Sequence, residues 1–319
     1  MPNAECRSRS MHERARYSNA RGAEQSRFEV IWERARNQAD NGRTRASLDP
    51  VDKCDAFAML RAALQRMKLF ETAADRDLAN GLELSPGTAE RIDNVWIFSG
   101  VGTLRKPVKE PDAEKNYKGD NPALIKEFLK WGNRRRFMHG MLVAQRIAEA
   151  RSGKQSPGDL ISDSSAACKR AEAVRAFMRS FGPTIIFGGY REENDEAKTE
   201  RSQRTNGIPP EKFLIVEPAA GEPEWATTTD QVRHFQIPPE VRGRTVALVS
   251  DDVHLNRIVH IAGRFHQYLP EGRPLYLFPS ALPAYGRTEY EDMELQGLLA
   301  YVYRDGVAAA EPYPYTLER

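Results

Sequence analysis

Hydrophobic positions along this chain fall into five short runs, each ending at a glycine, a serine or an acidic residue. The runs are residues 95–98, 184–187, 213–216, 246–249 and 275–278. Each run is too short for a buried helix and is rich in β-branched or aromatic residues, which favours buried strands. Segments with helical patterning separate the later runs, so the sequence predicts an α/β fold with a doubly wound, mostly parallel sheet.

The chain before the first run has a different pattern. Residues 1–50 are rich in arginine and have few apolar positions, which predicts a partly disordered tail followed by one short helix. Apolar residues recur at helical spacing over 51–80, with Asp52 as an acidic start. We therefore expect an N-terminal helical extension over 1–90 and an α/β domain over 91–319.

A long interval separates the first two predicted strands. Its early part, residues 106–121, is charged and contains two prolines, which indicates a surface loop. Residues 123–150 then have apolar faces at helical spacing, and a second helix after Asp163 leads to the strand at 184. The sequence predicts a helical insertion at about 103–165.

Composition narrows the class of protein without defining a function. The 319 residues are 40% apolar, and 47 basic and 45 acidic residues give a net charge of +2. So balanced a charge argues against nucleic acid or an anionic membrane as the main partner. Three distant cysteines indicate neither a zinc site nor a disulfide framework, and no apolar stretch approaches the roughly 20 residues that span a bilayer. We expect a soluble, cytoplasmic protein without a structural metal.

The residues that follow the strands are the candidates for chemistry. Ligands bind beyond the carboxyl ends of strands in open parallel sheets. Candidate ligand-binding residues are Ser99, Gly100, Gly102, Gly188, Gly189, Glu196, Thr228, Asp230 and Arg257, and candidate catalytic residues are His254, Glu217 and Asp251.

Glycines and acids at this edge allow more than one interpretation. Gly188 and Gly189 suit a positive φ and a close backbone approach to an anion, or simply a tight turn. The G-x-G at 100–102 falls short of a dinucleotide fingerprint, and there is no Walker A loop. The acidic residues can act as acid and base or hold Mg²⁺. Asp230 and Asp252 equally suit helix caps.

His254 and Arg257 lie three residues apart at the start of a predicted helix and therefore share a face. The imidazole suits proton transfer and the guanidinium suits an anion, whereas the alternative is a surface histidine beside a solvated arginine. The arginines at 134–136 are interpreted as a solvated helical face rather than a clamp for nucleic acid. Tyr313 and Tyr315 indicate a tail that docks on the surface or makes an oligomer contact.

Short motifs follow one another in a fixed order through the second half of the chain. They are the strand and double glycine at 184–189, Asp195-Glu196-Ala197, the turn at 207–209, Glu217, the helix start at 227–231, and the strand at 246–250 followed by His254 and Arg257. This ordered set resembles the ElyC/SanA/YdcF family of Rossmann-like α/β domains. The resemblance implies a nucleotide-like ligand, and one branch of the family is associated with S-adenosylmethionine. Thr227 and Gln231 stand where the family has asparagine.

Two functions are consistent with this sequence. The first is an enzyme, a transferase or hydrolase acting on a nucleotide-like or phosphorylated small molecule, in which His254 and Glu217 transfer protons and Arg257 neutralises negative charge. The second is a sensor that binds such a ligand, or S-adenosylmethionine, without turnover. A nucleotide, S-adenosylmethionine and Mg²⁺ are the candidate cofactors, and the sequence leaves the oligomeric state open.

Overall fold

The protein divides into two compact units in a computed structural model. The structure describes residues 11–41, 52–99, 132–160, 165–189, 193–198, 207–217, 228–233, 244–269, 272–282, 287–305 and 311–317. Unit 1 comprises residues 1–65 and 292–309, and unit 2 comprises residues 66–291 and 310–319. The division falls inside two helices rather than near residue 90, where the sequence shows a change in composition.

Unit 1 is helical. It contains α1 (Met11–Asn41), the start of α2 (Lys53–Asn80) and the end of α11 (Arg287–Asp305). Phe28, Ile31 and Ala35 of α1 are buried and recur at the helical spacing, and the ring of Phe28 packs edge-on against Phe57 of α2 with the centroids 5.8 Å apart. With 31 residues, α1 is much longer than the one short helix expected before residue 50.

Unit 2 contains a six-stranded parallel sheet in the order β3-β2-β1-β4-β5-β6. The strands are β1 (Asn94–Phe98), β2 (Thr184–Gly188), β3 (Phe213–Val216), β4 (Val246–Asp251), β5 (Leu275–Ser280) and β6 (Tyr315–Thr316). All five predicted strands are confirmed, and each is parallel to its neighbours. β6 was not predicted: Tyr315, interpreted as part of a tail, pairs with Leu275 of β5.

The strand order creates a switch point between β1 and β4. From β1 the chain moves outward to β2 and β3, and then returns to the other side of β1 to form β4. Open α/β sheets bind ligands beyond the carboxyl ends of the strands at such a point. The register pairs Phe98 with Gly188 and Ile97 with Val249, which brings the residues after β1, β2 and β4 to one edge.

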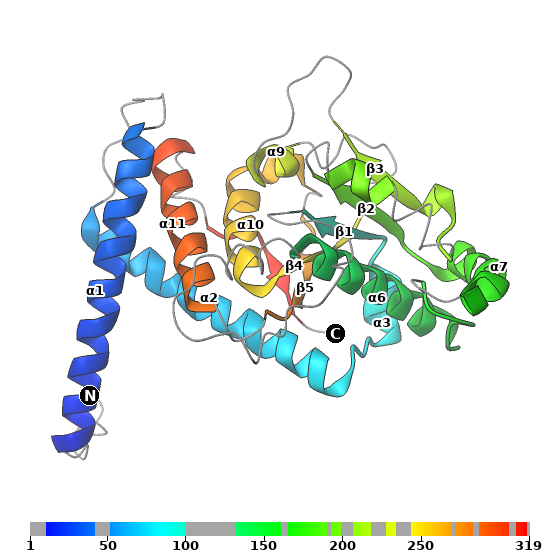
Figure 1. The fold of residues 1–319 in the computed structure, drawn as a ribbon, viewed down its shortest axis with the longest axis horizontal. Helices are drawn as coiled ribbons and strands as arrows, with labels where there is room; N and C mark the ends of the chain where they lie inside the picture. The colour runs from blue at the N-terminus through cyan, green and yellow to red at the C-terminus, as the bar shows by residue number, and fades with distance from the viewer. Residues whose placement is uncertain are drawn as a thin grey trace. The chain divides into compact units, whose positions relative to one another are not determined.

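Helices cover both faces of the sheet (Figure 1). They include α3 (Pro86–Arg91), α6 (Gly132–Ser152), α7 (Ser165–Phe181), α9 (Thr228–Arg233) and α10 (Asp252–Arg264). α6 lies so close to β1 that a Cβ on Gly140 would be 2.4 Å from Cγ1 of Ile97. The next residue of β1, Phe98, points the other way and packs edge-on against His254 of α10, with the ring centroids 5.9 Å apart. This arrangement confirms the doubly wound, Rossmann-like fold class.

The helix boundaries follow local signals in the sequence. Asp52 precedes α2, and its Oδ1 accepts a 2.9 Å hydrogen bond from the backbone N–H of Cys54, as its acidic position predicts. The insertion expected at 103–165 is helical over α6, whereas residues 100–131 and 161–164 lie outside the described part of the chain.

A search of the described helices for a bilayer-spanning segment found none with the required length and apolar content.

Candidate functional site

Buried polar side chains gather at the carboxyl ends of β1, β2 and β4. We call them the edge cluster: Ser99, Asn133, Arg136, Glu193, Asn194, Thr228, Gln231, Ser250, Asp251, Asp252 and His254, all of which are less than a tenth exposed. Burying a polar group costs free energy unless the group is hydrogen-bonded. So many buried polar side chains at one place therefore call for an explanation. The cluster lies at the edge where the sequence places its candidate residues.

An ion pair between Arg136 and Asp251 is almost completely buried within the cluster. Arg136, on α6, donates from Nη1 to Oδ2 of Asp251 at the end of β4 and from Nη2 to Oδ1 of Asn133 at 2.8 Å. Burial is the largest single influence and would lower the pKa of the Arg136 guanidinium, but the attraction of Asp251 together with contributions from Tyr290 and Glu193 raises that pKa. The interpretation of residues 134–136 as a solvated helical face is therefore wrong for Arg136.

Two asparagines connect the cluster to the segment after β2. Asn133 donates from Nδ2 to Oε1 of Glu193 at 2.7 Å. Asn194 accepts from the backbone N–H of Gly189 at 3.0 Å and donates from Nδ2 to the carbonyl of Gly189 at 3.1 Å. The N–H of Gly189 is thus bonded within the protein rather than directed at a ligand, contrary to its predicted role.

Gly188 and Gly189 differ in whether their surroundings leave room for a side chain. Neither residue has a positive φ, so the backbone does not use the left-handed conformation that the glycine pair would allow. A Cβ on Gly189 would lie 2.4 Å from Oε2 of Glu193 and 2.7 Å from Oγ of Ser99, whereas a Cβ on Gly188 would meet nothing closer than 3.7 Å. Only Gly189 is required by close approach, since it lets Ser99 and Glu193 crowd against the backbone after β2.

His254 lies in the first turn of α10 and is 2% exposed. Its Nε2 is 3.2 Å from Nη2 of Arg257 and 3.5 Å from Oγ1 of Thr228. A guanidinium can only donate, so Nε2 is the acceptor and the proton of the neutral imidazole is on Nδ1. Burial lowers the pKa of His254 well below 6.5, and the positive charges of Arg257 and Arg136 lower it further. Three predicted residues, His254, Arg257 and Thr228, therefore lie together, but around a neutral imidazole that is not on the surface.

Glu217 does not lie near His254. β2 and β1 separate β3, which Glu217 follows, from β4, which precedes His254. Three strand spacings amount to roughly 14 Å. Glu217 is exposed and forms a 2.5 Å ion pair with Lys198, and this hydrogen bond raises the pKa of Lys198. The predicted His254–Glu217 pair for proton transfer does not form in this structure.

The remaining predicted residues are divided between the cluster and its surroundings. Ser99 is buried at the end of β1, whereas Glu196 and Asp230 are half-buried on the helical segment 193–198 and on α9. Gly100 and Gly102 lie outside the described residues.

Asp252 is the first residue of α10, and its carboxylate is buried in an ion pair rather than solvated at a cap. Oδ2 accepts from Nη2 of Arg287 at 2.8 Å, and Nε of Arg287 is 3.1 Å from Oε1 of Glu71. Burial raises the pKa of Asp252 to about 7. Asp251 is paired with Arg136 and Asp252 with Arg287, so neither of the adjacent carboxylates favours the Mg²⁺ interpretation of these acids. Among the described residues, no group of three or more acidic, cysteine or histidine side chains is arranged to hold a metal ion.

Several members of the edge cluster could not be recognised as site residues from the sequence. Arg136 was noted only as one of three consecutive arginines, and Gln231 only as a departure from a family motif. Asn133 and Glu193 had no signal, because their significance comes from contacts between segments about 60 residues apart.

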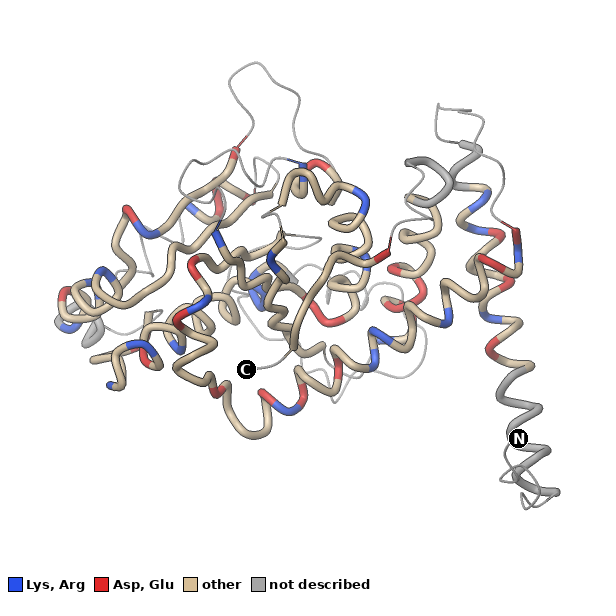
Figure 2. Tube along the Cα trace, turned by 180° about the vertical axis from the view of Figure 1, so that it is seen from behind, with Lys and Arg blue, Asp and Glu red and all other residues tan. Residues whose placement is uncertain are grey.

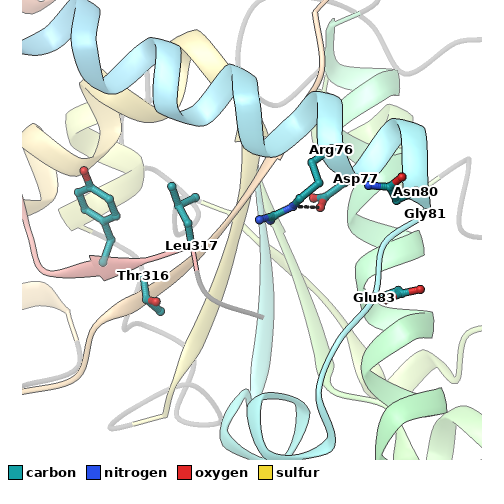
Figure 3. Close-up of a pocket in the computed structure, with 8 residues that line it drawn as sticks. Arg76, Asp77, Asn80, Gly81, Glu83, Thr316 and Leu317 are labelled. Atoms are coloured by element: carbon teal, nitrogen blue, oxygen red, sulfur yellow. Dashed lines mark ion pairs between the residues drawn. The ribbon is translucent and has the colours of Figure 1, made fainter.

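A surface cavity of about 650 Å³ elsewhere in unit 2 shares no residue with the cluster (Figure 3). It is lined by Arg76, Asp77, Asn80, Gly81, Glu83, Tyr315, Thr316 and Leu317. Nε of Arg76 is 3.6 Å from Oδ1 of Asp77, so part of the positive charge of Arg76 is balanced within the cavity. Charged residues of both signs are interspersed along the described chain (Figure 2).

The fold and the edge cluster together define the class: a doubly wound α/β protein with buried polar side chains at the switch point. Comparison with known proteins adds no family to this class, because no family model, curated protein or solved structure matches the chain.

Proposed function

We propose that this protein is a YdcF-like enzyme, a transferase or hydrolase, acting on a nucleotide-like or phosphorylated small molecule at the β1/β4 switch point. The observation that supports the proposal is a set of buried polar atoms with no hydrogen-bond partner among the described residues: Ser99 Oγ, Gln231 Oε1, Ser250 Oγ and His254 Nδ1. Each such atom costs about 1–3 kcal/mol when left unsatisfied. A polar ligand offsets that cost.

Arg257, beside the edge cluster, suits an anionic group on the ligand. The guanidinium of Arg136 is committed to Asp251, and that of Arg287 to Asp252. Arg257 is half-buried and touches His254, so it connects the buried atoms to the surface of α10. We assign to Arg257 the neutralisation of a phosphate or carboxylate.

A non-catalytic sensor is the second candidate, and one observation favours it. An imidazole whose pKa lies well below 6.5 is a weak base at neutral pH, and the Glu217 carboxylate is exposed and paired with Lys198. Under this alternative His254 serves as a hydrogen-bond donor to the ligand and transfers no proton.

Thermal-shift measurements on the full chain test whether a ligand binds. The panel contains nucleotides, S-adenosylmethionine, sugar phosphates and divalent cations. A ligand that binds only the native state raises the melting temperature, by an amount that grows with its concentration above Kd. No shift with any member of the panel would contradict both candidate functions.

Substitution of His254 distinguishes the enzyme from the sensor. For an enzyme, His254→Ala abolishes a measurable conversion of the ligand even at ligand concentrations that saturate the variant. For a sensor, no conversion is found with the native chain and the substitution weakens binding alone.

The proposed cytoplasmic location is checked separately by fractionation of the cells that produce the protein.

A further inference from the structure

We infer that Gln231 and His254 recognise the amino-bearing edge of a nucleobase, adenine or cytosine, in the ligand of the edge cluster. The inference rests on the function proposed above and adds the chemical identity of the ligand's uncharged end.

Gln231 offers a hydrogen-bond acceptor of fixed orientation. Its Nε2 donates to the backbone carbonyl of Ser99 across 3.5 Å. A carbonyl can only accept, so the NH₂ end of the amide faces Ser99 and the oxygen faces away. Oε1 is buried and has no hydrogen-bond partner within the described part of the chain. It requires an N–H or O–H group.

His254 offers a donor. Because Nε2 accepts from Arg257, the proton of the neutral ring is on Nδ1. Nδ1 is also buried, and no described residue accepts its hydrogen. It requires an acceptor such as a ring nitrogen or a carbonyl oxygen.

Contacts through Thr228 and the end of β1 link the side chains that carry the donor and the acceptor. Thr228 and Gln231 are three residues apart on α9 and share a face, and Thr228 touches the imidazole of His254. On the other side, Gln231 contacts Ser99 while His254 packs against the neighbouring Phe98. The two unsatisfied groups therefore flank the last residues of β1, where the hydroxyl of Ser99 is likewise unsatisfied among the described residues.

In the protein, Oε1 of Gln231 is the acceptor and Nδ1 of His254 is the donor. The matching ligand edge therefore carries a hydrogen-bond donor next to an acceptor. Adenine presents its N6 amino group next to N7, and cytosine presents its N4 amino group next to N3. The N7/O6 edge of guanine presents two acceptors and would leave Oε1 of Gln231 unpaired. Guanine N1–H beside O6 and uracil N3–H beside O4 also place a donor next to an acceptor, so guanosine and uridine are the competing ligands in the first test, and tighter binding of either than of adenosine and cytidine would overturn the inference. Sites built to hydrogen-bond a group reject analogues that lack it, because their own buried atoms stay unsatisfied.

The first test changes the ligand and leaves the chain unaltered. Isothermal titration calorimetry compares adenosine, cytidine, guanosine, uridine, purine riboside, which lacks the amino group, and ribose 5-phosphate, which lacks the base. Adenosine or cytidine is expected to bind at least tenfold more tightly than purine riboside. Equal binding by purine riboside would overturn the inference, whereas ribose 5-phosphate reports binding of the sugar and phosphate alone.

The second test changes the chain. Gln231→Met removes the acceptor at similar volume, and Gln267→Met makes the same change at an exposed position in the short helix His266–Tyr268. Gln231→Met is expected to abolish the tenfold preference for the amino group while leaving the Kd for ribose 5-phosphate unchanged. Gln267→Met should retain both. A uniform loss of affinity for every ligand in Gln231→Met would count against base recognition.

A parallel pair of variants examines the donor. His254→Asn keeps an N–H near the place of Nδ1, whereas His254→Leu does not. Asparagine should retain the preference for the amino-bearing base and leucine should lose it. Thermal melts of each variant check that the fold is intact. The comparison of ligands described above uses the native chain and does not depend on any variant being folded.

The outcomes separate this inference from the function on which it rests. If the chain binds no nucleotide or sugar phosphate, the proposed function fails and the inference fails with it. If the chain binds ribose 5-phosphate but does not distinguish adenosine or cytidine from purine riboside, the proposed function stands and the inference is wrong.

Discussion

Burial drives two side chains at the start of α10, Asp252 and His254, toward their neutral forms. It raises the pKa of Asp252 to about 7 and lowers that of His254 well below 6.5. Both shifts have desolvation as their largest cause, since a charged form loses hydration that the protein replaces only in part. The first turn of α10 therefore carries less charge near neutral pH than its sequence suggests.

The protonation state of His254 is directly measurable. We expect its imidazole to stay neutral, with the proton on Nδ1, throughout a titration from pH 8 to pH 6. The substitution Arg257→Gln should raise its pKa, because the charge of Arg257 is the second cause of the depression. Nitrogen-15 chemical shifts of the histidine ring report both quantities. Half-protonation of His254 near 6.5 would contradict the structure.

Asp252 makes a pH-dependent contribution to stability. In the native state it keeps its proton up to pH about 7, whereas the unfolded chain releases it near the ordinary value of 3.8. This contribution is fully present below pH 3.8 and is lost as the pH rises through 7. At 1.36 kcal/mol per unit of pKa, the loss amounts to about 4 kcal/mol at most.

Asp252→Asn should therefore gain stability relative to the native chain as the pH rises from 4 to 7. Urea unfolding of both proteins at each pH measures the difference. His254 contributes with the opposite sign, because a histidine kept neutral loses stability as the pH falls below 6.5, so only the comparison between the two proteins isolates Asp252. A pH-independent difference would show that the native pKa of Asp252 is not raised.

At the scale of elements, the end of β2 depends on close packing rather than on an unusual backbone. Gly189 lies where Ser99 of β1 and Glu193 of the following helical segment both approach the chain. Its own N–H and carbonyl are bonded to Asn194, which also donates to the carbonyl of Val216 at 3.3 Å. These contacts join the ends of three adjacent strands.

Two alanine substitutions at adjacent positions test this packing. Gly189→Ala should lower the free energy of unfolding by about 1–3 kcal/mol, because its methyl group overlaps two oxygen atoms. Gly188→Ala is the matched control, since its nearest non-bonded atom would be 3.7 Å away. Chemical denaturation measures both, and equal effects would argue against close packing at Gly189.

For unit 2 as a whole, the sheet depends on a segment from the end of the sequence. β6 covers the edge of β5, and Tyr313, which is 6% exposed, donates its backbone N–H to the carbonyl of Val259 at 2.9 Å. Tyr315 packs edge-on against Phe70 of α2, with the centroids 5.5 Å apart. These contacts tie residues 313–316 to the sheet and to the helices of unit 2.

Deletion of residues 311–319 should therefore destabilise the protein. We expect the free energy of unfolding to fall by at least about 3 kcal/mol, the cost of removing one large buried aromatic side chain. Guanidinium denaturation followed by circular dichroism checks this expectation. A deletion variant with unchanged stability would show that the terminal segment only docks on the surface, as the sequence alone suggested.

The sequence predicted those structural features that depend on residues close together in the chain. Buried parallel strands consist of continuous apolar runs, so the five long strands and their common carboxyl edge could be predicted. β6 has only two residues and lies in a Pro-rich stretch, and its pairing with β5 is a tertiary contact that no periodicity reveals.

The candidate site was predictable in part for the same reason. Ser99 follows β1, Asp251 ends β4 and His254 lies three residues further on, so all three could be located at the edge. Strand order could not be predicted, and it separates Glu217 from His254. Arg136 lies on α6 among other arginines, and its burial depends on the approach of Asp251 from 115 residues away.

The ion pair between Arg136 and Asp251 has a consequence for how this chain can vary. Removal of one member leaves the other as an uncompensated buried charge, at a cost of about 3–5 kcal/mol, whereas replacement of both by apolar residues is often tolerated. In a library with both codons randomised and selected for folded protein, the surviving clones should keep both charges or lose both. The two positions would then change in concert even though the sequence places them in different motifs.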